Sequence, residues 1–147
     1  MKTSLYLILI FLGIWSCSTT NKTVAVTPDE EALFQKKGND TVHLGDEESE
    51  YDIIIIEPGF NFWLQSIARP RGYYSKSYME SRNNIMVINW NQRVLQPFNF
   101  DPNLYEMQIN WDSSIDYGYE VNYKLYHYFI YFQRKYKQRL GPFVPRI

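Results

Sequence analysis

From residue 51 onward, the apolar positions alternate between spacings typical of strands and of helices. Residues 51–57 (YDIIIIE) are β-branched and apolar between charged ends, which predicts a buried strand that ends at Pro58-Gly59. Residues 105–111 place apolar side chains at every second position, which predicts a second strand. We expect these two strands to pair with each other in a minimal sheet.

Two further segments have the apolar spacing of helices. Residues 60–67 (FNFWLQSI) form a short apolar block that stops before Pro70, because the residue before a proline disfavours helical backbone. Residues 77–95 begin with SYME, which matches a capping box, and predict a longer helix. The stretch 85–90 within it could also be a strand.

Residues 117–139 predict the longest helix, with basic side chains gathered at its end as the helix dipole favours. One apolar stripe follows one side of it, and a second stripe of Tyr119, Tyr123 and Tyr126 lies well round the helix. A helix that is apolar on two sides is either sandwiched or partly covered by another molecule. The predicted fold is therefore a small α+β domain, with two or three helices on a two-stranded sheet and a long aromatic C-terminal helix. The polar strip left on that helix contains Glu120, Lys124, His127 and Arg134.

The N-terminal pattern is that of an export signal. Lys2 precedes an apolar run over residues 5–15, followed by Ser16 and by Cys17, the only cysteine of the chain. The run is too short to cross a bilayer, which needs roughly 20 residues. The ending resembles the bacterial lipobox, although Trp15 is larger than usual there. We expect residues 1–16 to be a signal peptide and Cys17 to carry lipid; the alternative is a secreted protein with one unpaired cysteine.

Composition separates a tether from a domain. Residues 18–50 hold three basic and eight acidic side chains and one aromatic ring. Low hydrophobicity with high net charge predicts that residues 17–50 are a disordered acidic tether, which would span roughly 30 Å as a coil. Residues 51–147 hold 11 basic, eight acidic and 22 aromatic residues, enough for a single globular domain. Their mild net charge does not suggest a nucleic-acid partner.

Catalytic and metal-binding patterns are weak. Neither histidine has a second histidine or a cysteine at ligand spacing, and no serine lies in a GxSxG motif. A carboxylate pair for glycoside hydrolysis could come from the last third of the chain, but nothing in the sequence fixes its geometry. We expect no cofactor, no metal and no enzymatic activity. The carboxylates concerned are Glu106, Asp112, Asp116 and Glu120.

Two groups of residues are candidates for binding. The loop 69–74 combines two guanidinium groups with two rings, and could hold an anion while the rings stack on a partner. The tyrosine stripe of the last helix could contact a partner or a sugar. For both groups the alternative is packing on the domain itself. The candidate residues are Arg69, Arg71, Tyr73, Tyr74, Tyr119, Tyr123 and Tyr126.

Four segments (GFNFWLQSIARP, YYSKSYMESRN, WNQRVLQP and IDYGYEVNYKLYHYF) make residues 51–141 similar to a family of small uncharacterised lipoproteins from diderm bacteria. The resemblance implies a lipoprotein topology and carries no activity, cofactor or ligand. Among lipoproteins generally, Ser18 after the cysteine resembles the type bound to the outer membrane. We therefore expect the protein in the cell envelope, on the periplasmic face of the outer membrane.

The leading functional hypothesis is a non-enzymatic envelope protein that holds or scaffolds a protein partner or associates with itself. A glycan- or peptidoglycan-binding module is the alternative, and a hydrolase comes third. Uncovered apolar surface on the last helix would favour a protein partner, and a groove lined by rings and amides would favour a glycan. Two carboxylates about 5–9 Å apart in a cleft would favour hydrolysis.

Overall fold

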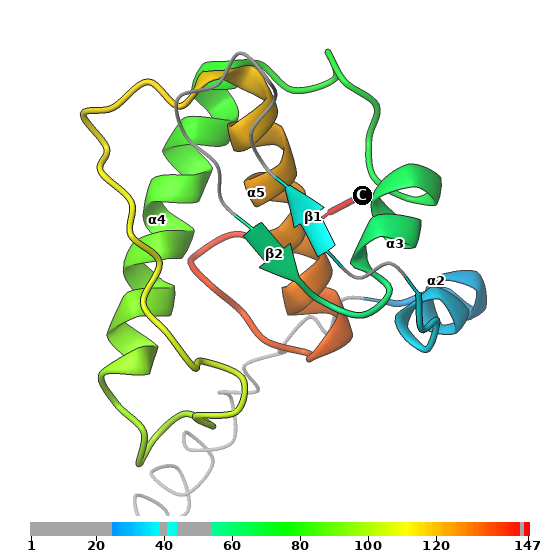
Figure 1. The fold of residues 1–147 in the computed structure, drawn as a ribbon, viewed down its shortest axis with the longest axis horizontal. Coiled ribbons are helices and arrows are strands. Elements are labelled where there is room, and N and C mark those ends of the chain that lie inside the picture. Colours follow the sequence, from blue (N-terminus) through cyan, green and yellow to red (C-terminus); the bar gives the residue numbers. More distant parts are fainter. Residues whose placement is uncertain (1–24, 39–40, 44–53, 145) are drawn as a thin grey trace, which may run out of the picture.

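The computed structural model describes residues 25–38, 41–43, 54–144 and 146–147. This part of the chain holds four helices and one antiparallel sheet of two strands (Figure 1). The predicted α+β class and the long aromatic C-terminal helix are confirmed. The elements are α2 (Pro28–Phe34), β1 (Thr41–His43), β2 (Ile54–Ile56), α3 (Phe60–Ser66), α4 (Lys76–Val94) and α5 (Gly118–Lys135).

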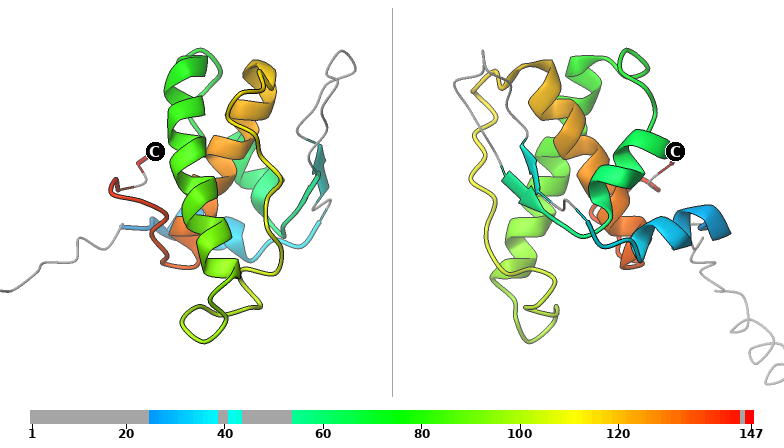
Figure 2. Two further views of the ribbon diagram at one scale, coloured as in Figure 1. Left: turned by 90° about the vertical axis from the view of Figure 1, so that its left-hand side faces the viewer. Right: turned by 45° about the vertical axis from the view of Figure 1, so that its right-hand side comes forward.

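Helix α5 is the centre of the molecule. The left view in Figure 2 shows it between α4 on one side and the sheet on the other. Helices α4 and α5 run in the same direction, since Lys76 contacts Asp116 near their starts and Arg93 contacts Gln138 near their ends. The chain must therefore return along the whole length of α4, about 28 Å for 19 residues, before α5 begins.

The helices predicted from spacing are confirmed, with small shifts at their ends. Helix α3 begins after Gly59, whose φ of 83° few other residues adopt. Helix α4 covers residues 85–90, so that stretch is helical and not a strand. Its N-cap is Ser75, whose side chain accepts a hydrogen bond from the backbone N–H of Tyr78 at 3.2 Å. The cap therefore lies two residues before the predicted capping box.

The predicted strand pairing is wrong. Strand β2 pairs with β1, with Val42 opposite Ile55, and both of these side chains are buried. Residues 105–111 form the extended return along α4 and belong to no strand. Side chains of α4 satisfy their backbone groups: the Asn91 side chain bonds both the N–H (2.8 Å) and the carbonyl (2.9 Å) of Ile109.

The prediction of a disordered tether is wrong for residues 25–38 and 41–43. They form α2 and β1, which pack on the rest of the domain and bury Phe34 and Glu30. Arg134 of α5 donates hydrogen bonds to both carboxylate oxygens of Glu30 at 2.5 Å, and Trp63 Nε1 donates a third at 2.9 Å. Residues 1–24 and 44–53, which include the predicted signal peptide, Cys17 and the rest of the tether, lie outside the described residues.

Two residues of the predicted polar strip on α5 are buried. His127 is 2% exposed and Arg134 is 4% exposed, because α3 and α2 cover this side of the helix. His127 Nδ1 bonds the backbone carbonyl of Tyr123 at 2.8 Å, and rings of neighbouring aromatic side chains surround its imidazole. Burial lowers the pKa of His127 to about 4, so this side chain is neutral at pH 7. Helix α5 is sandwiched, which was one of the two predicted alternatives.

Candidate functional site

The two candidate binding groups lie together on one face of the domain. The hydroxyl of Tyr119 accepts a hydrogen bond from the backbone N–H of Gly72 at 2.7 Å. The hydroxyl of Tyr123 donates one to the Arg69 carbonyl, also at 2.7 Å. The Arg71 guanidinium carbon lies 4.6 Å from the centre of the Tyr123 ring. The stripe of α5 is therefore the surface on which the loop 69–74 packs.

Both guanidinium groups of this loop already have partners. Arg71 bonds both carboxylate oxygens of Glu120, at 2.7 and 2.8 Å. This bidentate contact raises the pKa of Arg71 and lowers that of Glu120. Arg69 donates to the backbone carbonyl of Ile147 at 2.9 Å. An anion would have to displace these partners, so the geometry agrees with the packing alternative.

The tyrosines of this face differ in exposure. Tyr73 is 57% exposed and lies against Arg69, whose guanidinium carbon is 4.8 Å from the ring centre. Tyr74 stacks on Tyr78 with ring centres 5.0 Å apart, and meets Tyr126 edge-on at 5.2 Å. Tyr126 is buried, which raises the pKa of its phenol. Tyr73 is thus the candidate most available to a partner.

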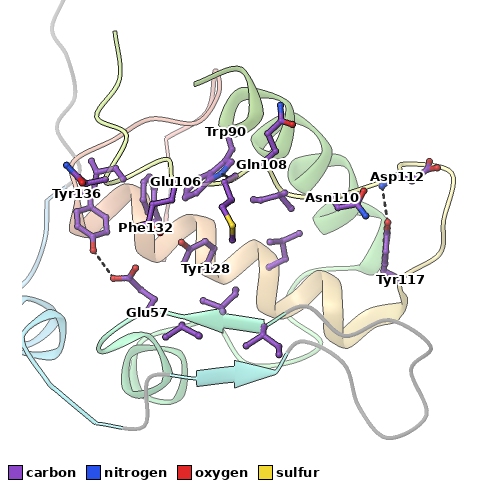
Figure 3. Close-up of a pocket in the computed structure, with 18 of the residues that line it drawn as sticks. Glu57, Trp90, Glu106, Gln108, Asn110, Asp112, Tyr117, Tyr128, Phe132 and Tyr136 are labelled. Carbon is purple, nitrogen blue, oxygen red and sulfur yellow. Dashed lines mark hydrogen bonds between the residues drawn. The ribbon is translucent and has the colours of Figure 1, made fainter. Parts of the chain in front are cut away.

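A groove that the sequence did not indicate lies on another side of α5 (Figure 3). Its volume is about 980 Å³. Strand β2 forms one wall and residues 103–112 form the other, so the mispredicted segment is one side of the site. The floor consists of apolar and aromatic side chains from α4 and α5, among them Trp90, Leu125, Tyr128 and Phe132.

Both walls of the groove carry exposed apolar side chains. Ile54 is 54% exposed, Ile56 is 73% exposed, and Met107 on the opposite wall is 76% exposed. Strand β2 has β1 on one edge, and in the described sheet no strand pairs with its other edge. Figure 3 shows that this other edge faces the groove.

The charged residues that line the groove are all acidic among those described: Glu57, Glu106 and Asp112. Glu57 is neutralised by Lys135 Nζ at 2.6 Å and accepts a bond from the Tyr136 hydroxyl at 2.8 Å. The structure gives neither Glu106 nor Asp112 a cationic partner in its described part. Three amide side chains complete the lining: Asn103, Gln108 and Asn110.

Two of the four carboxylates considered for hydrolysis, Asp116 and Glu120, are held by basic side chains, whereas Glu106 and Asp112 line the groove. Asp116 is held by Lys76 at 2.6 Å and Glu120 by Arg71, which lowers the pKa of both acids. Asp112 accepts bonds from the backbone N–H and hydroxyl of Ser114, which also lower its pKa. Glycoside hydrolysis needs one carboxyl with a raised pKa as general acid. Over the described ranges, no three histidine, cysteine or acidic side chains form a metal-ligand cluster.

These features define a small α+β domain with two distinct surfaces. On one, the loop 69–74 packs on the tyrosines of α5. The other is an open groove with exposed apolar side chains and carboxylates along its walls. Residues 5–144 match the model of a family of unknown function, DUF6146, and the chain belongs to this family. The predicted resemblance is thus confirmed as far as an uncharacterised family. No curated protein and no solved structure matches the chain. Within the described segments, no helix is long and apolar enough to span a bilayer.

Proposed function

We propose that the protein is a lipid-anchored protein of the bacterial cell envelope whose domain is a non-enzymatic module that holds a segment of a partner protein. Cys17 would carry the anchor, and the periplasmic face of the outer membrane is the proposed location. The support for the anchor is the order of basic, apolar and small residues before that cysteine. The support for the binding role is the groove.

The observation that carries the binding role is the exposed apolar lining of this groove. Ile54, Ile56 and Met107 stand more than half exposed around a floor of buried rings and leucine. Contiguous apolar surface with a polar rim is typical of protein interaction sites. A volume of about 980 Å³ lies at the upper end of the range of about 300–1,000 Å³ for small-molecule sites, so a peptide segment fits its size.

A glycan is the second candidate, because amides and rings line the same groove. Sugars stack on exposed ring faces, however, and the rings of Trp90 and Tyr117 in this lining are largely covered. Trp90 is 6% exposed and packs against Tyr105 and Phe132, with ring centres 5.0 and 4.8 Å away. Tyr117 is 8% exposed and stacks on Trp111 at 4.1 Å. The apolar side chains that are more than half exposed in the lining, Ile54, Ile56 and Met107, carry no ring, which favours a protein segment.

Site-specific photo-crosslinking in cells tests the proposal. A benzophenone amino acid replaces Met107 in the groove or, as a control, Leu95, which is 70% exposed and lies outside it. We expect one discrete protein adduct from position 107, identified by mass spectrometry, and no such adduct from position 95. Ile56→Ser should abolish the adduct, whereas Ile88→Ser, at a residue also more than half exposed but on the outside of α4, should not.

Two results would count against a protein partner. Muropeptides or polysaccharide in the adduct, without a consistent protein, would move the glycan module to first place. Equal crosslinking from positions 107 and 95 would mean that the groove is not the contact surface.

A further inference from the structure

We infer that the partner segment binds as an added β-strand on the open edge of β2, and that it is an extended, apolar segment carrying lysine or arginine. This inference rests on the proposed function, and it specifies how the groove recognises its ligand and what chemistry that ligand has. Three observations carry it: the unpaired edge of β2, the bonded backbone of the opposite wall, and the sign of the charges.

The first observation is the position of the strand edge. The two strands pair from Thr41 opposite Ile56 to His43 opposite Ile54, so β1 uses only one edge of β2. The other edge borders the groove along its length (Figure 3). An exposed strand edge presents backbone N–H and C=O groups at strand spacing, and an extended peptide satisfies them by adding a strand.

The second observation is that backbone groups of the facing wall are already bonded to α4. Both backbone groups of Ile109 are bonded by Asn91, and the Met107 carbonyl accepts from Trp90 Nε1 at 2.9 Å. A ligand in the groove therefore finds the edge of β2 on one side, and on the other a segment whose Met107 and Ile109 are turned to α4 for hydrogen bonding. In a strand added to β2, alternate side chains would point down to Leu125 and Tyr128 or outward beside Ile54 and Ile56.

The third observation is charge. Of the three acids that line the groove, Lys135 neutralises Glu57, which leaves the exposed carboxylates of Glu106 and Asp112. Complementary charge favours a cationic ligand and disfavours an acidic one. A second copy of the chain is a poor occupant, because its own β2 edge is bordered by the same exposed carboxylates, Glu106 and Asp112. Pairing the open edges of two copies would bring these like charges to the same rim.

Short peptides test this inference on the purified full-length protein in detergent micelles. The first is an acetylated heptapeptide of alternating lysine and valine, and the second has glutamate in place of lysine. Two more carry N-methyl groups on the lysine–valine peptide, either at every valine amide or at every lysine amide. Alternate amides of a strand point to opposite edges, so each methylated peptide blocks one edge only.

We expect the lysine–valine peptide to bind and the glutamate peptide to bind at least tenfold more weakly, measured by fluorescence anisotropy. One methylated peptide should lose about tenfold or more in affinity while the other stays within about threefold of the parent. Binding should also slow amide hydrogen exchange at Ile54–Ile56. The double variant Glu106→Gln/Asp112→Asn should weaken binding about tenfold, and Glu31→Gln, at an exposed acid on α2, should not.

The outcomes separate this inference from the proposed function. Equal binding of both methylated peptides would overturn strand addition, and equal binding of the acidic peptide would overturn the charge preference. Failure of every peptide to bind, with the crosslink from position 107 still present, would overturn the inference and leave the proposed function standing. Concentration-dependent dimerisation that Ile56→Ser abolishes would identify a second copy as the occupant and overturn it too.

Discussion

The buried ion pair between Glu30 and Arg134 gives the sharpest test of the structure. Glu30 is 0% exposed and Arg134 is 4% exposed, and the carboxylate also accepts a bond from Trp63. Glu30→Gln keeps the size of the side chain and an oxygen for the indole, but leaves a buried guanidinium without its counter-charge. Removing one partner of a buried pair costs about 3–5 kcal/mol.

This loss is a large fraction of the free energy of unfolding of the whole domain. A domain of this size has a free energy of unfolding of about 5–15 kcal/mol. With a urea dependence of about 2 kcal/mol per molar, the unfolding midpoint of Glu30→Gln should fall by roughly 2 M. Urea titration followed by circular dichroism measures it. Glu31→Gln, one residue along and exposed, is the control and should change the stability by about 0.5 kcal/mol or less.

A double variant isolates the charge. Glu30→Leu/Arg134→Met removes both ions together, and such replacements are often neutral or stabilising. It should therefore be more stable than Glu30→Gln. A midpoint for Glu30→Gln within about 0.3 M of the wild type would refute the reasoning, because it would mean that α2 does not pack on α5 in solution.

Three further predictions concern other parts of the chain. Radiolabelled palmitate should enter the wild-type protein and not Cys17→Ser; equal labelling would exclude lipid at this cysteine. The unfolded state takes up a proton on His127 near pH 6.5 and the folded state only near pH 4, so stability should fall by about 3 kcal/mol as the pH drops through this window. His127→Gln should show a shallower slope between pH 6.5 and 5 in urea titrations, and an unchanged slope would contradict the assignment. Asn91→Ala removes both bonds to Ile109 and should cost about 1–3 kcal/mol, whereas Asn89→Ala, which loses a bond to its own helix, should cost less.

The helices could be predicted because apolar spacing and helix caps are patterns within a short stretch of sequence. Helix α5 has 18 residues with apolar side chains at helical spacing, and α4 has a serine cap and a long apolar face. The extended conformation of residues 105–111 was also visible in their alternation. What alternation cannot reveal is the hydrogen-bond partner: side chains of α4 bond this segment, where a neighbouring strand was expected.

The role of the N-terminal segment depends on a contact distant in sequence. Its local excess of acids predicts disorder, yet the counter-charge for Glu30 is supplied by Arg134, 104 residues further on. A local count of charges cannot include such a partner. The polar strip on α5 was misjudged for the same reason, since His127 and Arg134 are covered by elements from the opposite half of the chain.

Of the candidate sites, the sequence indicated the loop 69–74 and the tyrosines of α5, but not the groove. The loop 69–74 and the tyrosines of α5 were each recognised by residue type, and packing on the domain was the alternative for each, but their contact with each other was not predicted. The groove could not be predicted, because its walls come from β2 and residues 103–112 and its floor from α4 and α5. Its recognition required the correct partner of β2, because among the described residues no strand then pairs with the other edge of β2.

With lipid on Cys17, the packing of α2 would limit how far the domain stands from a membrane. Arg134 also bonds the Ala25 carbonyl at 3.0 Å, so a residue only eight positions after Cys17 is held on the domain. With lipid on that cysteine, even a fully extended link of this length would reach at most about 28 Å. Ala25 would then stay within this distance of the bilayer, and a partner of the domain would have to come equally close to the membrane surface.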